Sequence, residues 1–147
     1  MVKLKKMRMY IKSSKRKTSK SNNLMWSFDS SVQKNVVKLL NKLNFPNFDS
    51  NRVFCLRSEN ANTRAIARIY GLSRIWQQVL KQKPAYIIEV VSEKYDKLSE
   101  REKTKVLLHE IAHIPQNFSG SLVPHIRRGK RSFYLKLKRL IEFTNEA

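Results

Sequence analysis

The order of its structural signals predicts that this chain adopts an α+β fold. Apolar residues recur at helical spacing in three stretches, and three short stretches rich in β-forming residues lie between the first and the second of them. With 147 residues and one cysteine, the chain is long enough for one core and cannot form an intrachain disulfide. We therefore expect a small mixed or antiparallel sheet of about three strands, with one helix packed across it and further helices towards both ends of the chain.

The first predicted helix spans residues 30–44. Ser30 followed by Gln33 is a capping-box pattern, which satisfies backbone N–H groups at the start of a helix. Apolar residues then recur every three or four positions, at Val32, Val36, Leu39, Leu40 and Leu43. Phe45-Pro46 ends the pattern, because proline lacks the N–H that a continuing helix needs.

Three short stretches predict the strands. Residues 52–57 (RVFCLR) and 65–70 are rich in β-forming side chains, and Gly71 ends the second of them. Residues 75–80, before Pro84, are compatible with a short helix or a loop. Residues 85–91 (AYIIEVV) are an almost continuous apolar run interrupted by Glu89, so we expect this strand to contact the core on at least one face.

The second helix has a well-marked start and end. Ser99, with Glu102 three residues later, forms another capping-box pattern, and an apolar stripe follows at Val106, Leu107, Ile111 and Ile114. Pro115 cannot continue the helix, which should end near His113 or Ile114. A loop containing Gly120 follows, and residues 132–143 predict a C-terminal helix.

A histidine pattern occupies the last turn of this second helix. His109 and His113 stand four residues apart, so both imidazoles share one helix face and can point at one metal ion. Glu110 is offset by about 100 degrees, which is enough to miss the metal and still reach a water molecule beside it. Paired histidines also occur as partly buried core residues, but the uncharged flanking residues and a third histidine within the next 12 positions favour a metal site.

His109, Glu110 and His113 form the HExxH pattern that is typical of zinc-dependent peptidases. The zinc of such a peptidase has three protein ligands and one open position, so a third ligand is needed. Downstream of His113, the possible ligands are His125, Glu142 and Glu146. We favour His125, which follows Pro124 at the end of the short loop. Upstream, Cys55 is a further possible ligand, although a lone cysteine in a strand is more often a small buried hydrophobic residue. We expect one Zn²⁺ ion because imidazole ligands suit zinc, although affinity alone would not exclude copper or nickel.

The formal net charge is +20, from 31 Lys and Arg against 11 Asp and Glu. Such a charge favours a polyanionic partner, most simply DNA, RNA or a ribonucleoprotein. We expect residues 1–26 to be a flexible basic arm and residues 27–147 to form a single domain. The basic residues of the arm are Lys3, Lys5, Lys6, Arg8, Lys12, Lys15, Arg16, Lys17 and Lys20. A second basic stretch, at 127–139, is equally compatible with solvated surface charge, and its candidate nucleic-acid contacts are Arg127, Arg128, Lys130 and Arg131.

The sequence shows no export or membrane signal. No apolar run approaches the roughly 20 residues of a membrane helix, and the basic N-terminal segment leads into no apolar signal-peptide core. The single cysteine gives no reason to expect an oxidising compartment. We expect a cytoplasmic protein without a membrane partner, associated with the nucleoid or with ribonucleoprotein.

The run HEIAHIPQNFSGSLVPH resembles the signature of the putative phage metallopeptidase family of viruses and prokaryotes, in which HE, two apolar residues, HIP, FSG and a closing His recur. The preceding AYIIEVVSEKYDKLS resembles that family's strand and linker, so the resemblance covers roughly residues 66–125 and leaves out both basic regions. It implies a zinc-peptidase-like domain, similar in outline to SprT-like proteases. It also implies Glu110 as the catalytic acid/base and, as ligands, His109, His113 and His125.

The mechanism that follows from these residues is a general-base hydrolysis. Glu110 would take a proton from the attacking water and pass it to the leaving amine. Candidate donors to the developing oxyanion, by proximity in sequence, are Tyr134, Arg127 and Arg128. A peptide substrate would extend along an edge strand, for which residues 85–91 are our candidate.

Two classes of function are compatible with these features. In the first, the chain is a metallopeptidase that hydrolyses peptide bonds near nucleic acid or in nucleic-acid-bound proteins. In the second, it is a basic nucleic-acid or ribonucleoprotein binding protein whose zinc site is structural or vestigial. The histidine spacing favours the first class, and the charge fits both.

Overall fold

The computed structural model describes residues 23–125 and 132–146, and its fold is α+β, as predicted. The three strands expected from β-forming residues are present as β2 (Val53–Glu59), β3 (Ala67–Gly71) and β4 (Tyr86–Val91). A further strand, β1 (Met25–Phe28), completes one sheet of order β1-β2-β4-β3. The sheet is mixed, because β2 and β4 run parallel while β1 with β2 and β3 with β4 run antiparallel.

Strand β1 was not expected from the sequence, and it lies where the basic arm was predicted to end. All four of its residues are exposed, so it lacks the alternation of buried and exposed side chains by which a strand is recognised. Its backbone pairs with β2 over the whole length, from Met25 opposite Glu59 to Phe28 opposite Leu56. The structured part of the chain therefore begins before residue 27, and the sheet has four strands rather than about three.

The first helix, α1 (Ser30–Leu43), has the predicted apolar stripe and a different cap. Asp29 is the N-cap residue, and its Oδ1 accepts a hydrogen bond of 2.9 Å from the backbone N–H of Val32. The capping box predicted at Ser30 is wrong because the Gln33 side chain points to the sheet. It donates to the carbonyl of Val53 (2.7 Å) and accepts from the N–H of Cys55 (2.8 Å), which fixes α1 against β2.

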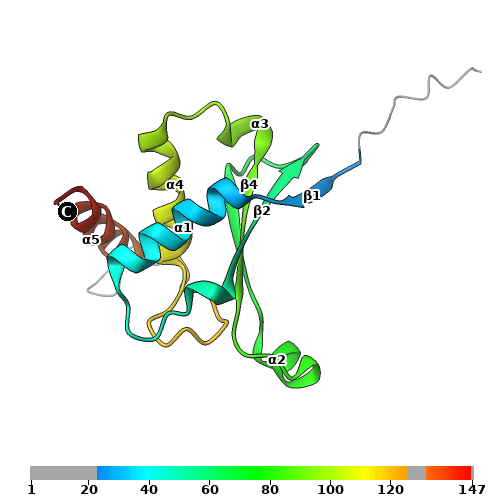
Figure 1. Ribbon diagram of the computed structural model, residues 1–147, viewed down its shortest axis with the longest axis vertical. Coiled ribbons are helices and arrows are strands. Elements are labelled where there is room, and N and C mark those ends of the chain that lie inside the picture. The colour runs from blue at the N-terminus through cyan, green and yellow to red at the C-terminus, as the bar shows by residue number, and fades with distance from the viewer. Residues whose placement is uncertain (1–22, 126–131, 147) are drawn as a thin grey trace, which may run out of the picture.

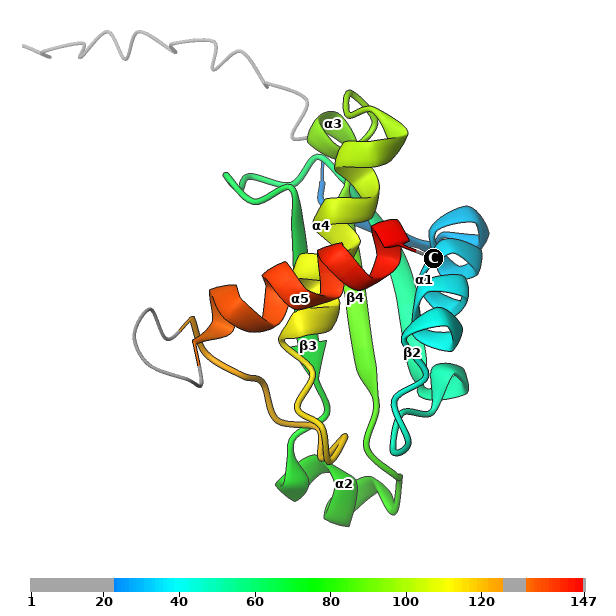
Figure 2. The same cartoon turned by 90° about the vertical axis from the view of Figure 1, so that its left-hand side faces the viewer.

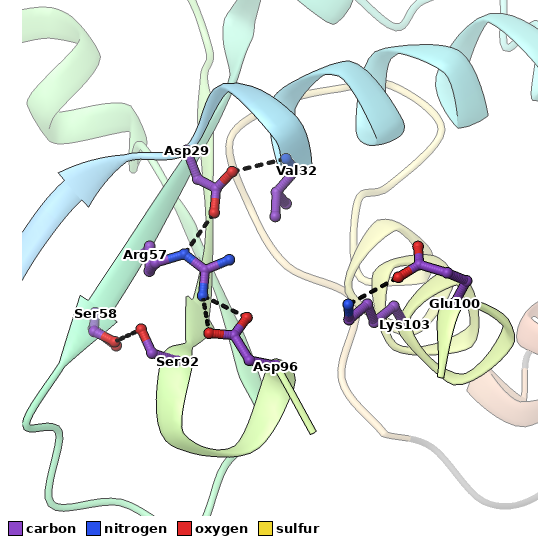
Figure 3. A network of polar contacts seen from close by, with 8 residues as sticks. All are labelled: Asp29, Val32, Arg57, Ser58, Ser92, Asp96, Glu100 and Lys103. Atoms are coloured by element: carbon purple, nitrogen blue, oxygen red, sulfur yellow. Dashed lines mark hydrogen bonds and ion pairs between the residues drawn. The ribbon is translucent and has the colours of Figure 1, made fainter. Parts of the chain in front are cut away.

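The start of α1 is also fixed by an ion-pair network, drawn in Figure 3. The Arg57 guanidinium lies 2.7 Å from the Asp29 carboxylate and 2.6 Å from that of Asp96. Asp96 directly follows the short helix α3 (Ser92–Tyr95), which was not predicted from the sequence. The network therefore connects α1, β2 and the segment that leads into the histidine helix.

The histidine helix is α4 (Glu100–Ala112), and its predicted capping box is confirmed. Ser99 accepts from the N–H of Glu102 at 3.3 Å, and the Glu102 carboxylate accepts from the N–H of Ser99 at 2.8 Å. His113 is the C-cap residue, directly before Ile114 and Pro115, where the helix was predicted to end. The C-terminal helix α5 (Phe133–Glu146) runs three residues further than predicted, and residues 75–80 belong to a helix, α2 (Arg74–Leu80).

The core lies between one face of the sheet and the helices α1, α4 and α5 (Figures 1 and 2). Alternate strand residues such as Cys55, Ile88 and Val90 face this layer and are fully buried. No helix in the described part of the chain is long and apolar enough to cross a membrane. Within residues 23–125 and 132–146, no long helix lies on the opposite face of the sheet (Figure 1).

Candidate metal centre

The three histidines of the chain converge at the end of α4. His109 comes from the last turn of that helix, His113 from its C-cap and His125 from the loop that returns to it. One ring nitrogen of each lies within 4.8 Å of those of the other two, and the Nε2 atoms of His109 and His125 are 3.1 Å apart. Three imidazole nitrogens this close together can coordinate a single transition-metal ion.

The loop between His113 and His125 is anchored to the sheet through Tyr86. The Tyr86 hydroxyl accepts from the N–H of Gly120 (2.8 Å) and donates to the carbonyl of Ser121 (2.9 Å). Gly120 has φ +88°, and a Cβ at Gly71 of β3 would overlap the Gly120 carbonyl oxygen. The buried Phe118 ring packs on Tyr86 with centroids 4.9 Å apart. These contacts set the path that brings His125 back to the helix.

Val123 connects the two ends of that loop. Its N–H donates to the carbonyl of His113 at 2.7 Å, and its carbonyl lies 2.6 Å from Nδ1 of the same residue. Since a carbonyl can only accept, Nδ1 carries the proton and Nε2 of His113 is left with a free lone pair. This fixed tautomer prepares His113 to bind a metal through Nε2.

Burial favours the neutral imidazoles that metal binding requires. Desolvation, followed by the neighbouring histidines, lowers the pKa of His109. Desolvation also lowers the pKa of His113, against the raising effect of its bond to Val123. Near neutral pH both rings are therefore unprotonated and available as ligands.

Phe133, the first residue of α5, forms one wall of the site. Its fully buried ring stacks on His113 at a centroid distance of 4.4 Å and meets His109 and His125 edge-on at 5.0 and 4.6 Å. Lys136, one turn further along α5, donates to the carbonyl of Ile114 at 2.7 Å. The sequence did not predict the role of Phe133, because nothing in the local sequence relates the start of α5 to histidines 8, 20 and 24 residues earlier.

Glu110 lies beside the histidines and is buried on the side of the core. Desolvation raises its pKa to about 7, and no described residue forms a hydrogen bond with its carboxylate. A cleft of about 570 Å³ opens next to it, between the start of β3, α4 and α5. Its lining comprises Arg64, Ile66, Ala67, Lys105, Val106, His109, Glu110, Leu137 and Ile141.

The sequence profile of a known family, described as putative phage metallopeptidase, matches residues 24–146. The chain belongs to this family. Family membership identifies it as a metallopeptidase-type protein, which implies a bound metal ion and protein or peptide substrates. No curated protein and no solved structure gives a significant match to the chain.

The match is broader than the resemblance seen in the sequence. It begins at residue 24, so it includes β1 and α1, and it extends through α5. The second basic stretch, at 127–139, is therefore part of the family domain. Residues 1–23, which contain every basic residue of the expected arm, are outside it.

The other candidate residues predicted from the sequence lie away from the histidines or outside the described residues. Cys55 is fully buried in the core beneath the sheet, where burial raises the pKa of its thiol to about 12. Glu142 lies 3.8 Å from the Lys138 ammonium and is not part of the metal-binding group. The Tyr134 ring is 6.2 Å from that of His125. Outside the described residues are Lys3, Lys5, Lys6, Arg8, Lys12, Lys15, Arg16, Lys17, Lys20, Arg127, Arg128, Lys130 and Arg131.

The prediction that residues 85–91 form an edge strand for a peptide substrate is wrong. Strand β4 pairs with β2 on one side and with β3 on the other, so its backbone has no free edge. The edges of the described sheet are β1 and β3, and β3 is the one that contacts α4. The continuous apolar run of β4 reflects this central position rather than a role in binding.

Proposed function

We propose that this protein is a zinc-dependent peptidase in which His109, His113 and His125 hold one zinc ion. The observation that carries the proposal is the convergence of the three imidazoles within 4.8 Å, next to Glu110 and an open cleft. Neutral imidazoles are ligands that zinc binds well, and three of them leave a fourth position open. When bound there, zinc supplies a Lewis acid that polarises a carbonyl and acidifies water.

Glu110 is the proposed general acid/base. It accepts a proton from the attacking water and donates it to the leaving amine as the peptide bond breaks. The buried position of Glu110 raises its pKa to about 7, and a nearby cation would favour the carboxylate. The side chain thus has a basicity suited to exchanging protons near neutral pH.

The cleft beside Glu110 supports a substrate preference. Its walls are apolar at Ile66, Val106, Leu137 and Ile141, while Arg64 and Lys105 also line it. We propose that a peptide aligns with the free edge of β3 and places an apolar side chain in this cleft. Acidic residues flanking that side chain would be favoured by the two cations.

Activity and metal content decide this proposal. Purified protein should bind one zinc ion and cleave an unfolded protein substrate, and a chelator should abolish cleavage. Glu110→Gln should keep the zinc and lose at least about 10²-fold in kcat, because it removes the proton acceptor and leaves the ligands in place. Zinc-loaded Glu110→Gln that cleaves as fast as the wild type would contradict the assignment.

A second proposal follows from the net charge of +20. We propose that the basic residues between Lys3 and Lys20, together with Arg127, Arg128, Lys130 and Arg131, bring the peptidase to nucleic acid in the cytoplasm, where it acts on bound proteins. The alternative is a nucleic-acid or ribonucleoprotein binding protein with a structural zinc site. Undetectable cleavage combined with unfolding on zinc removal would favour that alternative.

A further inference from the structure

One face of the sheet is covered by no long helix of the residues that the structure describes. Helices α1, α4 and α5 lie on the other face, and this side of the sheet looks outward (Figure 1). Because strand side chains alternate, the pairing register places one set of residues on this outward face. We call this set the open face: Trp26, Phe28, Phe54, Leu56, Ser58, Arg68, Tyr70, Ile87, Glu89 and Val91.

The open face carries four aromatic side chains that remain in contact with solvent. The exposed fractions are 57% for Trp26, 80% for Phe28, 37% for Phe54 and 45% for Tyr70. They come from three strands, β1, β2 and β3. Exposed aromatic groups gathered on one surface are costly in water, and such a patch usually marks an interaction site.

The register arranges these rings in rows across the strands. Phe54, Ile87 and Tyr70 are neighbours in one row, so the two aromatic residues stand on either side of β4, on backbones about 10 Å apart. A hollow of about 200 Å³ lies there, lined almost entirely by apolar atoms. Phe28 begins the next row, beside Leu56. The hollow and the two rings that flank it offer an apolar surface to a flat ligand.

A polar cluster at the centre of the open face holds two of the rings in place. The Glu89 carboxylate accepts from the Trp26 indole N–H at 3.3 Å and from the Tyr70 hydroxyl at 2.7 Å. Arg68 donates to both Glu89 oxygens, at 2.8 and 3.2 Å. Glu89 is only 1% exposed and is the one acidic residue of the open face, so the surface presents no uncompensated negative charge.

The net charge of the whole chain indicates which kind of partner binds the open face. A second copy would bring together two proteins that each carry a net charge of +20, and this repulsion opposes self-association. A polyanion with planar apolar groups satisfies both the charge and the aromatic surface. We propose that the open face binds single-stranded nucleic acid, with bases stacked on Trp26, Phe28, Phe54 and Tyr70.

This surface suits single strands rather than duplexes. Bases in a duplex are stacked on one another and cannot offer their faces to protein rings, whereas those of a single strand can. Stacking contacts the base face, which DNA and RNA share, so the open face should not discriminate strongly between them. The binding surface is on the opposite side of the sheet from the three histidines and does not require peptidase activity.

The test is oligonucleotide binding by the full zinc-loaded protein, followed by fluorescence anisotropy. A labelled single-stranded 12-mer, its RNA counterpart and a duplex of the same sequence serve as probes. Phe28→Ala and Phe54→Ala should each weaken single-strand binding by about tenfold and leave duplex binding nearly unchanged. The matched control is Phe143→Ala, since Phe143 is 50% exposed and belongs to α5, which lies on the other side of the sheet, and its loss should change neither affinity.

Unchanged single-strand affinity in both variants would overturn the proposal, and so would an equal loss of affinity for single strand and duplex. A dimeric wild type that becomes monomeric when Phe28 or Phe54 is replaced would also overturn it, because the open face would then bind a second copy of the chain. Phe28 is so exposed that its loss does not threaten folding, so Phe28→Ala decides the matter even if Phe54→Ala is unstable. Glu110→Gln should bind the single strand like the wild type, which separates this result from the peptidase assignment.

Discussion

His113 and Val123 are joined by two hydrogen bonds, one to the backbone of His113 and one to its ring. The Val123 N–H donates to the His113 carbonyl at 2.7 Å, and the Val123 carbonyl accepts from Nδ1 of the His113 ring at 2.6 Å. The pair closes the loop that carries His125 and fixes the tautomer of His113. Both consequences depend on the main chain of Val123 and not on its side chain.

Val123→Pro should therefore weaken zinc binding. The substitution removes the N–H donor, and loss of a contact that orients a ligand typically reduces metal affinity by about 10- to 100-fold. Val123→Ala keeps both backbone bonds and should bind zinc like the wild type. Competition with a chromogenic chelator measures both dissociation constants, and equal values for the two variants would show that the pair does not orient the ligand.

Phe133→Ala should destabilise the protein and loosen the histidine cluster. Removing a fully buried aromatic ring leaves a cavity and typically costs about 3–5 kcal/mol of unfolding free energy. Urea denaturation of the zinc-loaded protein measures this cost, with the exposed Phe143→Ala as a control expected to change stability by less than about 0.5 kcal/mol. A small loss for Phe133→Ala would mean that the ring is not part of the packed site.

Gly71→Ala should disturb the metal centre from a distance. Its new Cβ would overlap the Gly120 carbonyl oxygen, so the loop leading to His125 must shift. Such overpacking costs about 1–3 kcal/mol, and zinc affinity should fall with it. Thermal unfolding with and without zinc separates the two effects. A variant with wild-type Tm and wild-type zinc affinity would show that the close approach of the two glycines is unimportant.

Tyr134→Phe tests the proposed oxyanion donor that the structure places beside His125. If the hydroxyl stabilises the developing charge, its removal should lower kcat by about 10²-fold and leave zinc affinity unchanged, because the ring remains. Tyr134→Ala should lower kcat to the same extent, and a fall in zinc affinity in this variant alone would show that the ring also supports His125. Full activity of Tyr134→Phe would remove the hydroxyl from the mechanism.

The Asp29–Arg57 pair predicts a pH dependence of stability. Burial raises the pKa of Asp29, but the Val32 N–H and the Arg57 guanidinium outweigh it and hold that pKa below 3.8. The carboxylate therefore stabilises the fold fully above pH 3.8, and this contribution is lost as the pH falls through the lower folded-state pKa. Asp29→Asn should cost about 1–3 kcal/mol at pH 7 and progressively less in acid.

Thermal unfolding between pH 2.5 and 7 measures that difference. Glu100→Gln is the control, because its ion pair with Lys103 is at the surface and should contribute less than about 1 kcal/mol. A difference between Asp29→Asn and the wild type that stays constant down to the lowest pH would show that the charge of Asp29 does not matter.

Local signals in the sequence were sufficient for several parts of the structure. The Ser99 capping box and Pro115 define the two ends of α4, because helix caps and helix breakers act within a few residues. The apolar stripe of α1 and the β-forming runs of β2, β3 and β4 were visible for the same reason. The histidine spacing predicted a metal site, since i and i+4 positions share a helix face.

Features that depend on distant parts of the chain were not visible. Strand β1 has no buried side, and it exists because its backbone pairs with β2 about 30 residues later. The central place of β4, and hence the free edge of β3, is a matter of strand order, which no local pattern encodes.

The sequence by itself thus determined which residues can bind a metal and on which helix they lie, because spacing along a helix is a local property. Only the tertiary structure decided how those residues are held. Three contacts hold them: the Val123 carbonyl accepts from His113, the Phe133 ring packs against all three histidines, and the Tyr86 hydroxyl accepts from Gly120. Each contact joins segments that come together only when the core forms.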